Sequence, residues 1–229
     1  MKKGTLILAA LALAAPQLLP LSAGTMPAKA QEVGKLYAAK PPQGSAFIRI
    51  ISAINANVVV EFGSLEAREL STKSPITDFR LMKGGVDAQI FVDGKKVGDM
   101  INVPEDSFMT LLLWQENEQI KNAAIVDQTR GHDDLKAELR LYNLVPGCNA
   151  SLALADGPDV FKDVAPGTSM RRSINPVSAD LLGKCAAVTS NAFSLPSLKA
   201  GDRFSLFLTG SADKPALGGQ TDRTVMPGQ

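Results

Sequence analysis

The sequence is short of the residues that most enzymes use for catalysis. Its 229 residues include one histidine, His132, and two cysteines. A Ser-His-Asp triad would have to use His132, which lies in a polar stretch that we interpret as a linker, and a linker holds a catalytic base too loosely. Neither a G-x-S-x-G nucleophile elbow nor a glycine-rich phosphate-binding loop occurs. We therefore predict no catalytic residue, no bound cofactor and a protein that is not an enzyme.

Metal and nucleic-acid binding are also disfavoured. Two cysteines and one histidine cannot complete a four-ligand zinc site without carboxylates. Three of the 24 lysines and arginines lie within residues 1–30, and without that segment 21 basic residues face 23 acidic ones. A chain so close to neutral lacks the electrostatic footprint of a protein that binds nucleic acid or polyanionic sugars, although a local basic patch remains compatible with this balance.

An apolar run at the N-terminus is too short to span a bilayer. Lys2 and Lys3 precede the apolar residues 6–15, and residues 28–30 (AKA) have the small-x-small pattern of a cleavage site. This order is typical of a secretory signal peptide over residues 1–30. We expect export to the periplasm and a mature chain of residues 31–229, whose length suits two domains of about 100 residues each.

Short β-branched segments separated by turns predict an all-β protein. Residues 44–52 (GSAFIRIIS) have the pattern of a strand, and residues 136–143 (KAELRLYN) are similar to it when Arg49 is aligned with Arg140. Because side chains alternate between the faces of a strand, the apolar neighbours of both arginines should point inward and the arginines outward.

The similarity continues in the same order along the chain. Residues 58–63 parallel residues 152–157, and residues 104–112 parallel residues 200–208. We interpret this as one β-sandwich domain present twice, a tandem repeat joined by a short linker. The expected organisation is a lead-in over 31–43, domains over 44–126 and 135–210, a linker over 127–134 and a flexible tail over 211–229.

The strongest local signal is a β-hairpin in the first half. Residues 86–92 and 95–97 alternate around Asp93-Gly94. Asp-Gly supplies the positive φ angles that a type I′ turn requires, so we predict a tight two-residue turn there.

Both cysteines, Cys148 and Cys185, lie in the second half. An exported chain with two cysteines favours a disulfide, and two buried free thiols are the alternative.

Four residues are candidates for binding a partner. Arg49 is expected to face outward from its strand, and Trp114 closes a strand, where a core or edge position is more typical than a sugar-binding platform. Arg171 and Arg172 form a basic pair on a turn-like stretch and suit an acidic partner, although a solvated pair is the more frequent arrangement.

Residues 36–37 (LY) and 42–50 (PQGSAFIRI) resemble the AlgF family of alginate O-acetylation proteins, and residues 160–164 (VFKDV) and 175–177 (NPV) are similar to its second-half pattern. The resemblance departs at Ser52, where the asparagine kept at Asn143 is expected. It implies a periplasmic protein needed to acetylate an exported polysaccharide, alginate or acetylated cellulose. The implied partners are a membrane-bound O-acyltransferase, a periplasmic SGNH-type acetyltransferase and the polysaccharide itself.

Three functions fit these observations. The first is an accessory or adaptor protein of polysaccharide acetylation, which docks the enzymes through sheet edges or loops. The second is an acetyl carrier or acetyltransferase with an unusual covalent residue, such as Ser45 or Ser169. The third is a periplasmic chaperone or carbohydrate-binding module, since pilus-type chaperones also use two β-sandwiches.

Overall fold

The computed structural model describes residues 40–127 and 135–226, and every regular element in these ranges is a β-strand. The all-β prediction is therefore confirmed. No helix in the described ranges is long and apolar enough to cross a membrane. The signal peptide expected at 1–30, most of the lead-in segment, and His132 lie outside the described residues.

The first half forms two facing sheets. Its outer sheet has the order β3-β2-β5-β6 and comprises β2 (Val58–Phe62), β3 (Arg68–Leu70), β5 (Val86–Val92) and β6 (Lys95–Val103). Its inner sheet has the order β4-β1-β7-β8 and comprises β1 (Ser45–Ser52), β4 (Phe79–Lys83), β7 (Ser107–Glu116) and β8 (Gln119–Asp127). Here "inner" means facing the other half of the chain.

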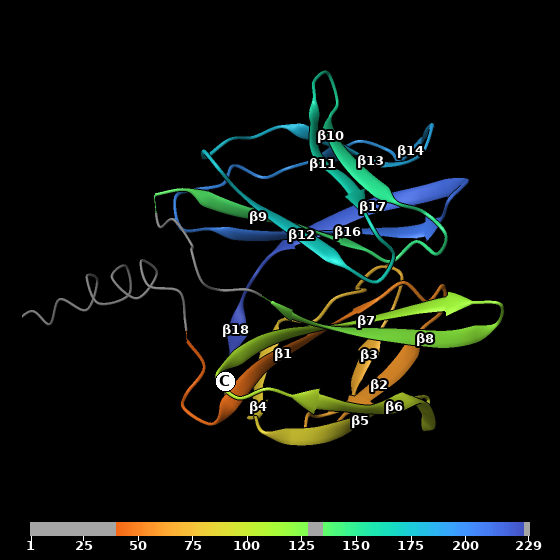
Figure 1. Cartoon of the computed structure of the whole chain (residues 1–229), viewed down its shortest axis with the longest axis vertical. Coiled ribbons are helices and arrows are strands. Elements are labelled where there is room, and N and C mark those ends of the chain that lie inside the picture. Colours follow the sequence, from red (N-terminus) through yellow and green to blue (C-terminus); the bar gives the residue numbers. More distant parts are fainter. Residues whose placement is uncertain (1–39, 128–134, 227–229) are drawn as a thin grey trace, which may run out of the picture.

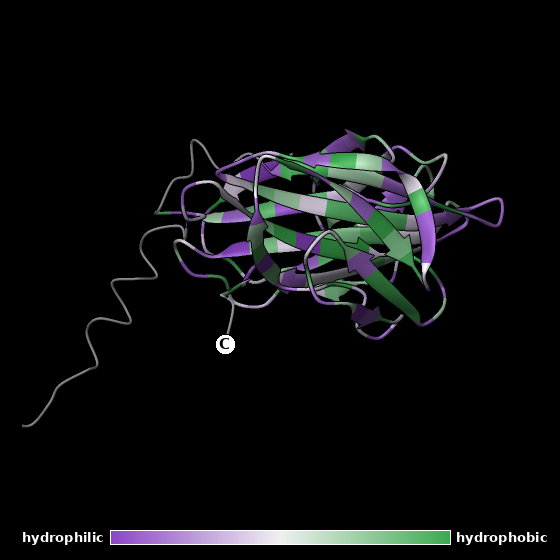
Figure 2. Cartoon of the chain, turned by 90° about the horizontal axis from the view of Figure 1, so that it is seen from below, coloured by the Kyte–Doolittle hydropathy of each residue, from purple (hydrophilic) through white to green (hydrophobic). Residues whose placement is uncertain are grey.

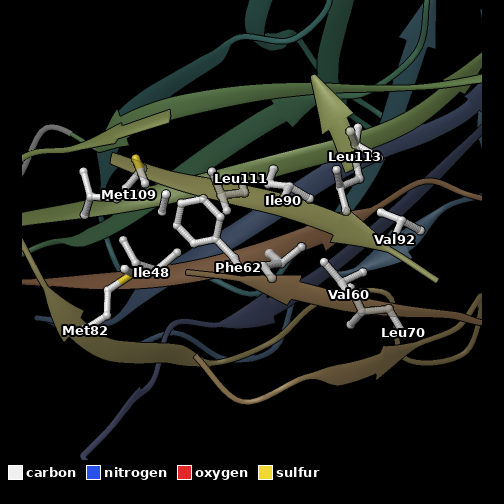
Figure 3. Packing of buried hydrophobic residues seen from close by; sticks show 14 of the residues in the cluster. Ile48, Val60, Phe62, Leu70, Met82, Ile90, Val92, Met109, Leu111 and Leu113 are labelled. Carbon is white, nitrogen blue, oxygen red and sulfur yellow. The ribbon is translucent and has the colours of Figure 1, made fainter. Parts of the chain in front are cut away.

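Apolar side chains fill the space between these two sheets (Figure 3). Ile48 of β1 and Phe62 of β2 are fully buried there, together with Ile90 of β5 and Leu111 of β7. Each strand contributes alternate residues to this core, because successive side chains point to opposite faces. The expectation that the isoleucines beside Arg49 point inward is thus confirmed.

The predicted hairpin is present as β5 and β6. Asp93 and Gly94 have φ angles of 49° and 72°, the left-handed values of a type I′ turn.

The second half also forms two facing sheets. Its inner sheet has the order β12-β9-β16-β17 and comprises β9 (Ala137–Asn143), β12 (Ser169–Ile174), β16 (Arg203–Ser211) and β17 (Lys214–Thr221). Its outer sheet has the order β11-β10-β13-β14, with β15 also paired to β13, and comprises β10 (Ala150–Leu154), β11 (Asp159–Val164), β13 (Asp180–Cys185), β14 (Val188–Thr189) and β15 (Phe193–Ser194). A separate apolar core, from Ala137 to Leu208, fills the space between them.

The inner sheets of the two halves have the same strand order and directions. β1 pairs antiparallel with β4 and parallel with β7, and β9 pairs antiparallel with β12 and parallel with β16. This agreement supports the interpretation of the chain as a repeat.

One sequence alignment between the halves is wrong by one residue. Matching residues 104–112 to 200–208 equates Phe108 with Phe204. In the sheets, Arg49 lies opposite Thr110 and Arg140 lies opposite Ser205, so Phe204 is equivalent to Met109. Because strand side chains alternate, a shift of one residue exchanges the two faces.

The expectation of a flexible tail over residues 211–229 is also wrong for the described part of that segment. Residues 214–221 form β17, paired with β16 over its whole length. Residues 224–225 form β18 (Thr224–Val225), which pairs in parallel with β4 of the first half. The low apolar content of this segment hid its strands, because β17 includes Gly218 and Gly219, which pack beneath Phe207 and Phe204.

The described sheets stack in four layers, with the two inner sheets in contact (Figure 1). Seen from below, hydrophilic and hydrophobic residues alternate along the outermost strands (Figure 2). This alternation matches sheets with one face on a core and one face in water.

Candidate functional site: a charged cluster between the halves

Arg49 lies at the centre of a charged cluster between the two inner sheets. Its side chain is 1% exposed, and the guanidinium donates hydrogen bonds to Thr110 (2.9 Å), Asp222 (2.6 Å) and Tyr142 (2.6 Å). Thr110 belongs to the first half, whereas Asp222 and Tyr142 belong to the second. The expectation that Arg49 points outward to solvent is therefore wrong. It points away from the core of its own half but into the boundary between the halves.

Arg140 occupies a similar position in the second half. Its guanidinium donates to Asp127 of the first half and to Glu138 of its own strand (2.9 Å). Asp127 also accepts hydrogen bonds from Thr110 and Tyr142, each at 2.6 Å. Asp127 was expected to open the linker, and it is instead the buried last residue of β8. Each half thus supplies a buried arginine and an aspartate to the other.

Four members of the cluster have shifted pKa values: Arg49, Arg140, Glu138 and Tyr142. Burial opposes the charges of Arg49 and Arg140, but nearby carboxylates and the Tyr142 oxygen raise the pKa of both above the ordinary value. Burial would also raise the pKa of Glu138, yet Arg140, with Arg203 and Arg171, more than offsets this and holds that pKa below its usual range. Burial raises the pKa of Tyr142, so its hydroxyl stays neutral and donates.

Two groups of apolar side chains border the cluster. Ile51 and Leu112 of the first half pack against Leu144 and Phe207 of the second. On the other side, three phenylalanines gather: Phe47, Phe79 and Phe108. The guanidinium of Arg49 lies 4.3 Å from the centre of the Phe79 ring. In such a low-dielectric setting, satisfied ion pairs are strong and an unpaired charge is costly.

The other three candidate partner-binding residues have different surroundings. Trp114 is partly buried and packs with the apolar residues between the halves. Arg171 and Arg172 are on strand β12 and not on a turn, so their side chains leave opposite faces. Arg171 donates to Glu138 (3.0 Å) beside the cluster, whereas Arg172 is exposed and donates to the carbonyl of Val160 (3.3 Å).

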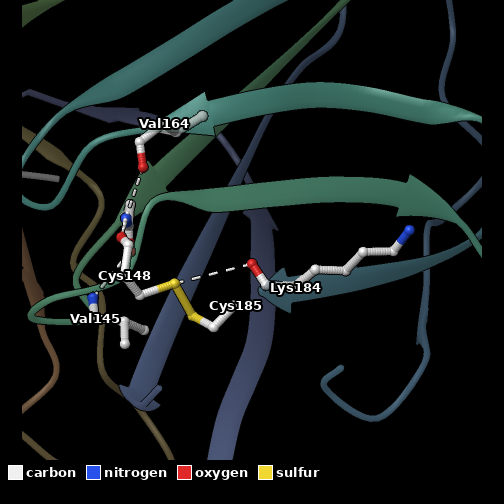
Figure 4. The surroundings of a disulfide bond; sticks show 6 residues. Val145, Cys148, Val164, Lys184 and Cys185 are labelled. Carbon is white, nitrogen blue, oxygen red and sulfur yellow. Dashed lines mark hydrogen bonds between the residues drawn. A yellow bond between two sulfur atoms is a disulfide. The ribbon is translucent and has the colours of Figure 1, made fainter. Parts of the chain in front are cut away.

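Cys148 and Cys185 form a disulfide in the core of the second half (Figure 4). Their Cα atoms are 5.6 Å apart, within the usual range for a disulfide. Asn143 supports the loop before Cys148: its amide donates to the carbonyls of Cys148 (2.7 Å) and Val164 (2.8 Å). At the equivalent position of the first half, the hydroxyl of Ser52 accepts the amide of Ile54 (3.3 Å), just as the side chain of Asn143 accepts the amide of Val145 (3.0 Å).

The described residues bring no reacting groups together around the candidate serines. The hydroxyl of Ser45 donates to the carbonyl of Pro42, which is not a general base, and Ser169 lies within strand β12. Within residues 40–127 and 135–226, no three metal-binding side chains are grouped to hold an ion. A depression of about 790 Å³ lies between β6 and the β7–β8 turn, and its lining includes three lysines together with Asp99 and Glu118.

Sequence reasoning missed Asp127, Tyr142 and Asp222. A signal for the two aspartates does exist, since residues 127–129 (DQT) and 222–224 (DRT) share an Asp-x-Thr pattern at the ends of β8 and β17. Tyr142 carries no such signal, because the equivalent residue of the first half is Ile51.

The fold and the buried cluster define an all-β protein of stacked sheets whose halves are joined by ion pairs, with no assembled reaction centre among the described residues. The family model "Alginate O-acetyl transferase AlgF" matches residues 18–187. The chain belongs to the AlgF family.

Two relatives of the chain carry the AlgF name. The alginate biosynthesis protein AlgF of Pseudomonas aeruginosa is 30% identical over 200 residues, which cover 86% of this chain and 88% of that protein. The protein of the same name from Pseudomonas putida is 28% identical over 84% of this chain and 86% of its own length. Solved structures of the C-terminal domain of AlgF from P. aeruginosa are 34% identical over 38% of this chain and 98% of that domain, with a TM-score of 0.34.

Proposed function

We propose that this chain is a periplasmic accessory protein of alginate O-acetylation, acting as an adaptor for the acetylating enzymes. Membership of the AlgF family is the observation that carries the proposal, because the family model and the relatives are named for alginate acetylation and alginate biosynthesis. The proposed partners are a periplasmic SGNH-type acetyltransferase and a membrane-bound O-acyltransferase, with the polysaccharide as a further ligand. Export by the signal peptide at residues 1–30 would place the mature chain beside them.

The described geometry is compatible with a binding role. The guanidinium groups of Arg49 and Arg140 are buried and donate hydrogen bonds to carboxylates of the same chain. Accessible candidates remain on the edge strand β12, where Met170 is 42% exposed and Arg172 is exposed beside it. An edge strand with an exposed apolar side chain and a cation fits a partner segment that is extended and acidic.

A second candidate function is acetyl transfer by the chain itself. The description of the family model as an acetyl transferase favours it. Ser45 and Ser169 would be the acetylated residues. A buried or backbone-bonded hydroxyl is a weak nucleophile without a neighbouring base, so this candidate requires a base brought by a partner.

A binding experiment with labelled acetyl groups separates the two candidates. The mature chain would be mixed with a periplasmic SGNH-type acetyltransferase of alginate acetylation and a radiolabelled acetyl donor, and the complex would be isolated by size exclusion. Stable binding with no label on this chain supports the adaptor. Label that remains on this chain, and that is lost in the Ser45→Ala or Ser169→Ala variant, refutes it in favour of acetyl transfer.

Matched charge reversals test the docking strand. Arg172→Glu places a negative charge on the exposed face of β12, whereas Lys73→Glu makes the same change on an exposed loop of the first half. We expect the first variant to weaken binding by tenfold or more, about 1.4 kcal/mol, and the second to leave it unchanged. Equal effects of both variants would argue against docking at β12.

A further inference from the structure

The charged cluster has an internal symmetry that the sheet registers define. Arg49 lies opposite Thr110 in the β1–β7 pair, and Arg140 lies opposite Ser205 in the β9–β16 pair. Thr110 and Ser205 are therefore equivalent residues of the two halves. Both carry a hydroxyl, and both hydroxyls point into the space between the inner sheets, where they are fully buried.

The two aspartates are equivalent in the same way. Asp127 lies opposite Phe108 at the end of β8, and the amide of Asp222 donates to the carbonyl of Arg203 at the end of β17 (2.8 Å). Phe108 lies two residues before Thr110, and Arg203 lies two residues before Ser205, so the two aspartates occupy equivalent positions. Within each half the buried hydroxyl donates to the aspartate, at 2.6 Å from Thr110 and 2.7 Å from Ser205.

The ion pairs then cross between the halves. Arg49 of the first half pairs with Asp222 of the second, and Arg140 of the second pairs with Asp127 of the first. Equivalent residues of the two halves therefore make equivalent contacts in opposite directions. An isologous two-fold interface in a homodimer has the same reciprocal pattern. Here it occurs within one chain.

The symmetry is broken at the corners of the interface. Phe47, Phe79 and Phe108 form an apolar corner in the first half. The equivalent positions of the second half carry Glu138, Arg171 and Arg203, which form a charged corner.

The apolar corner adjoins a segment from the far end of the chain. β18 pairs with β4 at Phe79, whose amide donates to the carbonyl of Arg223 (2.9 Å), and the side chain of Gln220 donates to the carbonyl of Thr77 (3.3 Å). Asp222 lies between these two contacts. We define residues 220–225 as the clasp.

We propose that the two halves are joined as a pseudo-two-fold intramolecular dimer, in which the crossed Arg–Asp pairs set the register of the inner sheets and the clasp fastens the second half onto the first. The ion pairs supply directional contacts that a flat apolar interface lacks, and a buried polar cluster of this kind can select one arrangement over others. The clasp adds main-chain pairing, which requires β18 to reach β4 while β17 stays in its own sheet. The proposal concerns how the halves are held and is independent of the proposed function.

Amide hydrogen exchange on the full mature chain tests the proposal. The variants are Asp222→Asn and Asp127→Asn, which remove equivalent halves of the two crossed pairs. Removing one partner of a buried pair costs enough that local opening should speed exchange by about a hundredfold. We expect this increase in β1, β4, β9 and β16 for both variants, and additionally in β18 for Asp222→Asn. The strands of the outer sheets, such as β5 and β13, should keep their protection.

Two further variants act as controls. Glu66→Gln removes the same kind of charge from an ion pair with Arg68 and Arg80, at a residue that is 77% exposed in the first half. It should leave exchange at the interface unchanged. Val225→Pro removes the amide of β18 that faces β4 and leaves the buried charges untouched, so it should open β18 and β4 even if both aspartate variants fail to fold.

Three outcomes would overturn the proposal. In the first, the aspartate variants show no more exchange at the inner sheets than Glu66→Gln does. In the second, only one of the two aspartate variants speeds exchange at the inner sheets, which would mean that only one of the two crossed pairs holds the halves together. In the third, Val225→Pro leaves the exchange of β4 unchanged, so that the clasp does not hold the halves together.

Discussion

Replacing Cys148 and Cys185 together by alanine should lower the free energy of unfolding by about 4 kcal/mol. The two cysteines are 37 residues apart in sequence, and the chain-entropy relation for a closed loop of that size gives this value at 25 °C. Alanine is the suitable replacement because both side chains are almost fully buried, and a serine hydroxyl would add the cost of an unpaired polar group.

Urea unfolding of the mature chain measures this loss. With a slope of about 2 kcal/mol per molar urea, the midpoint should fall by about 2 M. Circular dichroism would follow the strands of both halves, and the fluorescence of Trp114 would follow the boundary between them, where its side chain packs. Reduced wild-type protein is the matched control, since it loses the bond but keeps both sulfur atoms.

A loss below about 1 kcal/mol in both the variant and the reduced protein would refute the reasoning. It would mean that the unfolded chain is already restricted between Cys148 and Cys185. A loss in the variant alone would assign the effect to the packing of the two side chains in the core of the second half and not to the loop.

Two more predictions follow from single residues. Arg140 lowers the pKa of Glu138 in the folded state, so the stability that the Glu138 carboxylate contributes is present above the unfolded pKa of about 4.5 and is lost as the pH falls through the lower folded value. The melting temperature should therefore fall less between pH 7 and pH 3 in Glu138→Gln than in wild type. An equal fall in both proteins would contradict this. Gly98 has a φ of 64° and a Cβ there would meet the side chain of Asn122 at 2.2 Å, so Gly98→Ala should cost about 1–3 kcal/mol in urea unfolding. Gly94→Ala, with a similar φ of 72° and open space around it, isolates the backbone strain, and an equal loss in both variants would show that the contact with Asn122 costs nothing.

Local patterns along the chain were sufficient for the fold class. Alternating apolar residues marked β1 and β9, and Asp93-Gly94 marked the hairpin, because both signals arise from neighbouring residues. The segment 214–225 was missed for the opposite reason. Its glycines and polar residues carry no alternation, and they form strands because β16 and β4 offer edges to pair with.

The candidate site shows the same division. The sequence indicated that Arg49 and Arg140 are equivalent and that their side chains point away from the core of their own half. It could not show that the opposite face is also buried, because that depends on the second inner sheet, about 90 residues away in the chain. Exposure to solvent was therefore the wrong expectation for Arg49, and the partners Asp127 and Asp222 were hidden in segments taken for a linker and a tail.

By itself the sequence determined the all-β class, the similarity between its halves, the hairpin turn and the likeness to the AlgF family, since each depends on residue order over short ranges. Only the tertiary structure decided that the two cysteines come within bonding distance, which aspartate meets which arginine, and that the crossed pairs lie between two sheets. Those contacts join residues 13 to 173 positions apart, and which of them form is set by how whole sheets pack and not by any local preference of the chain.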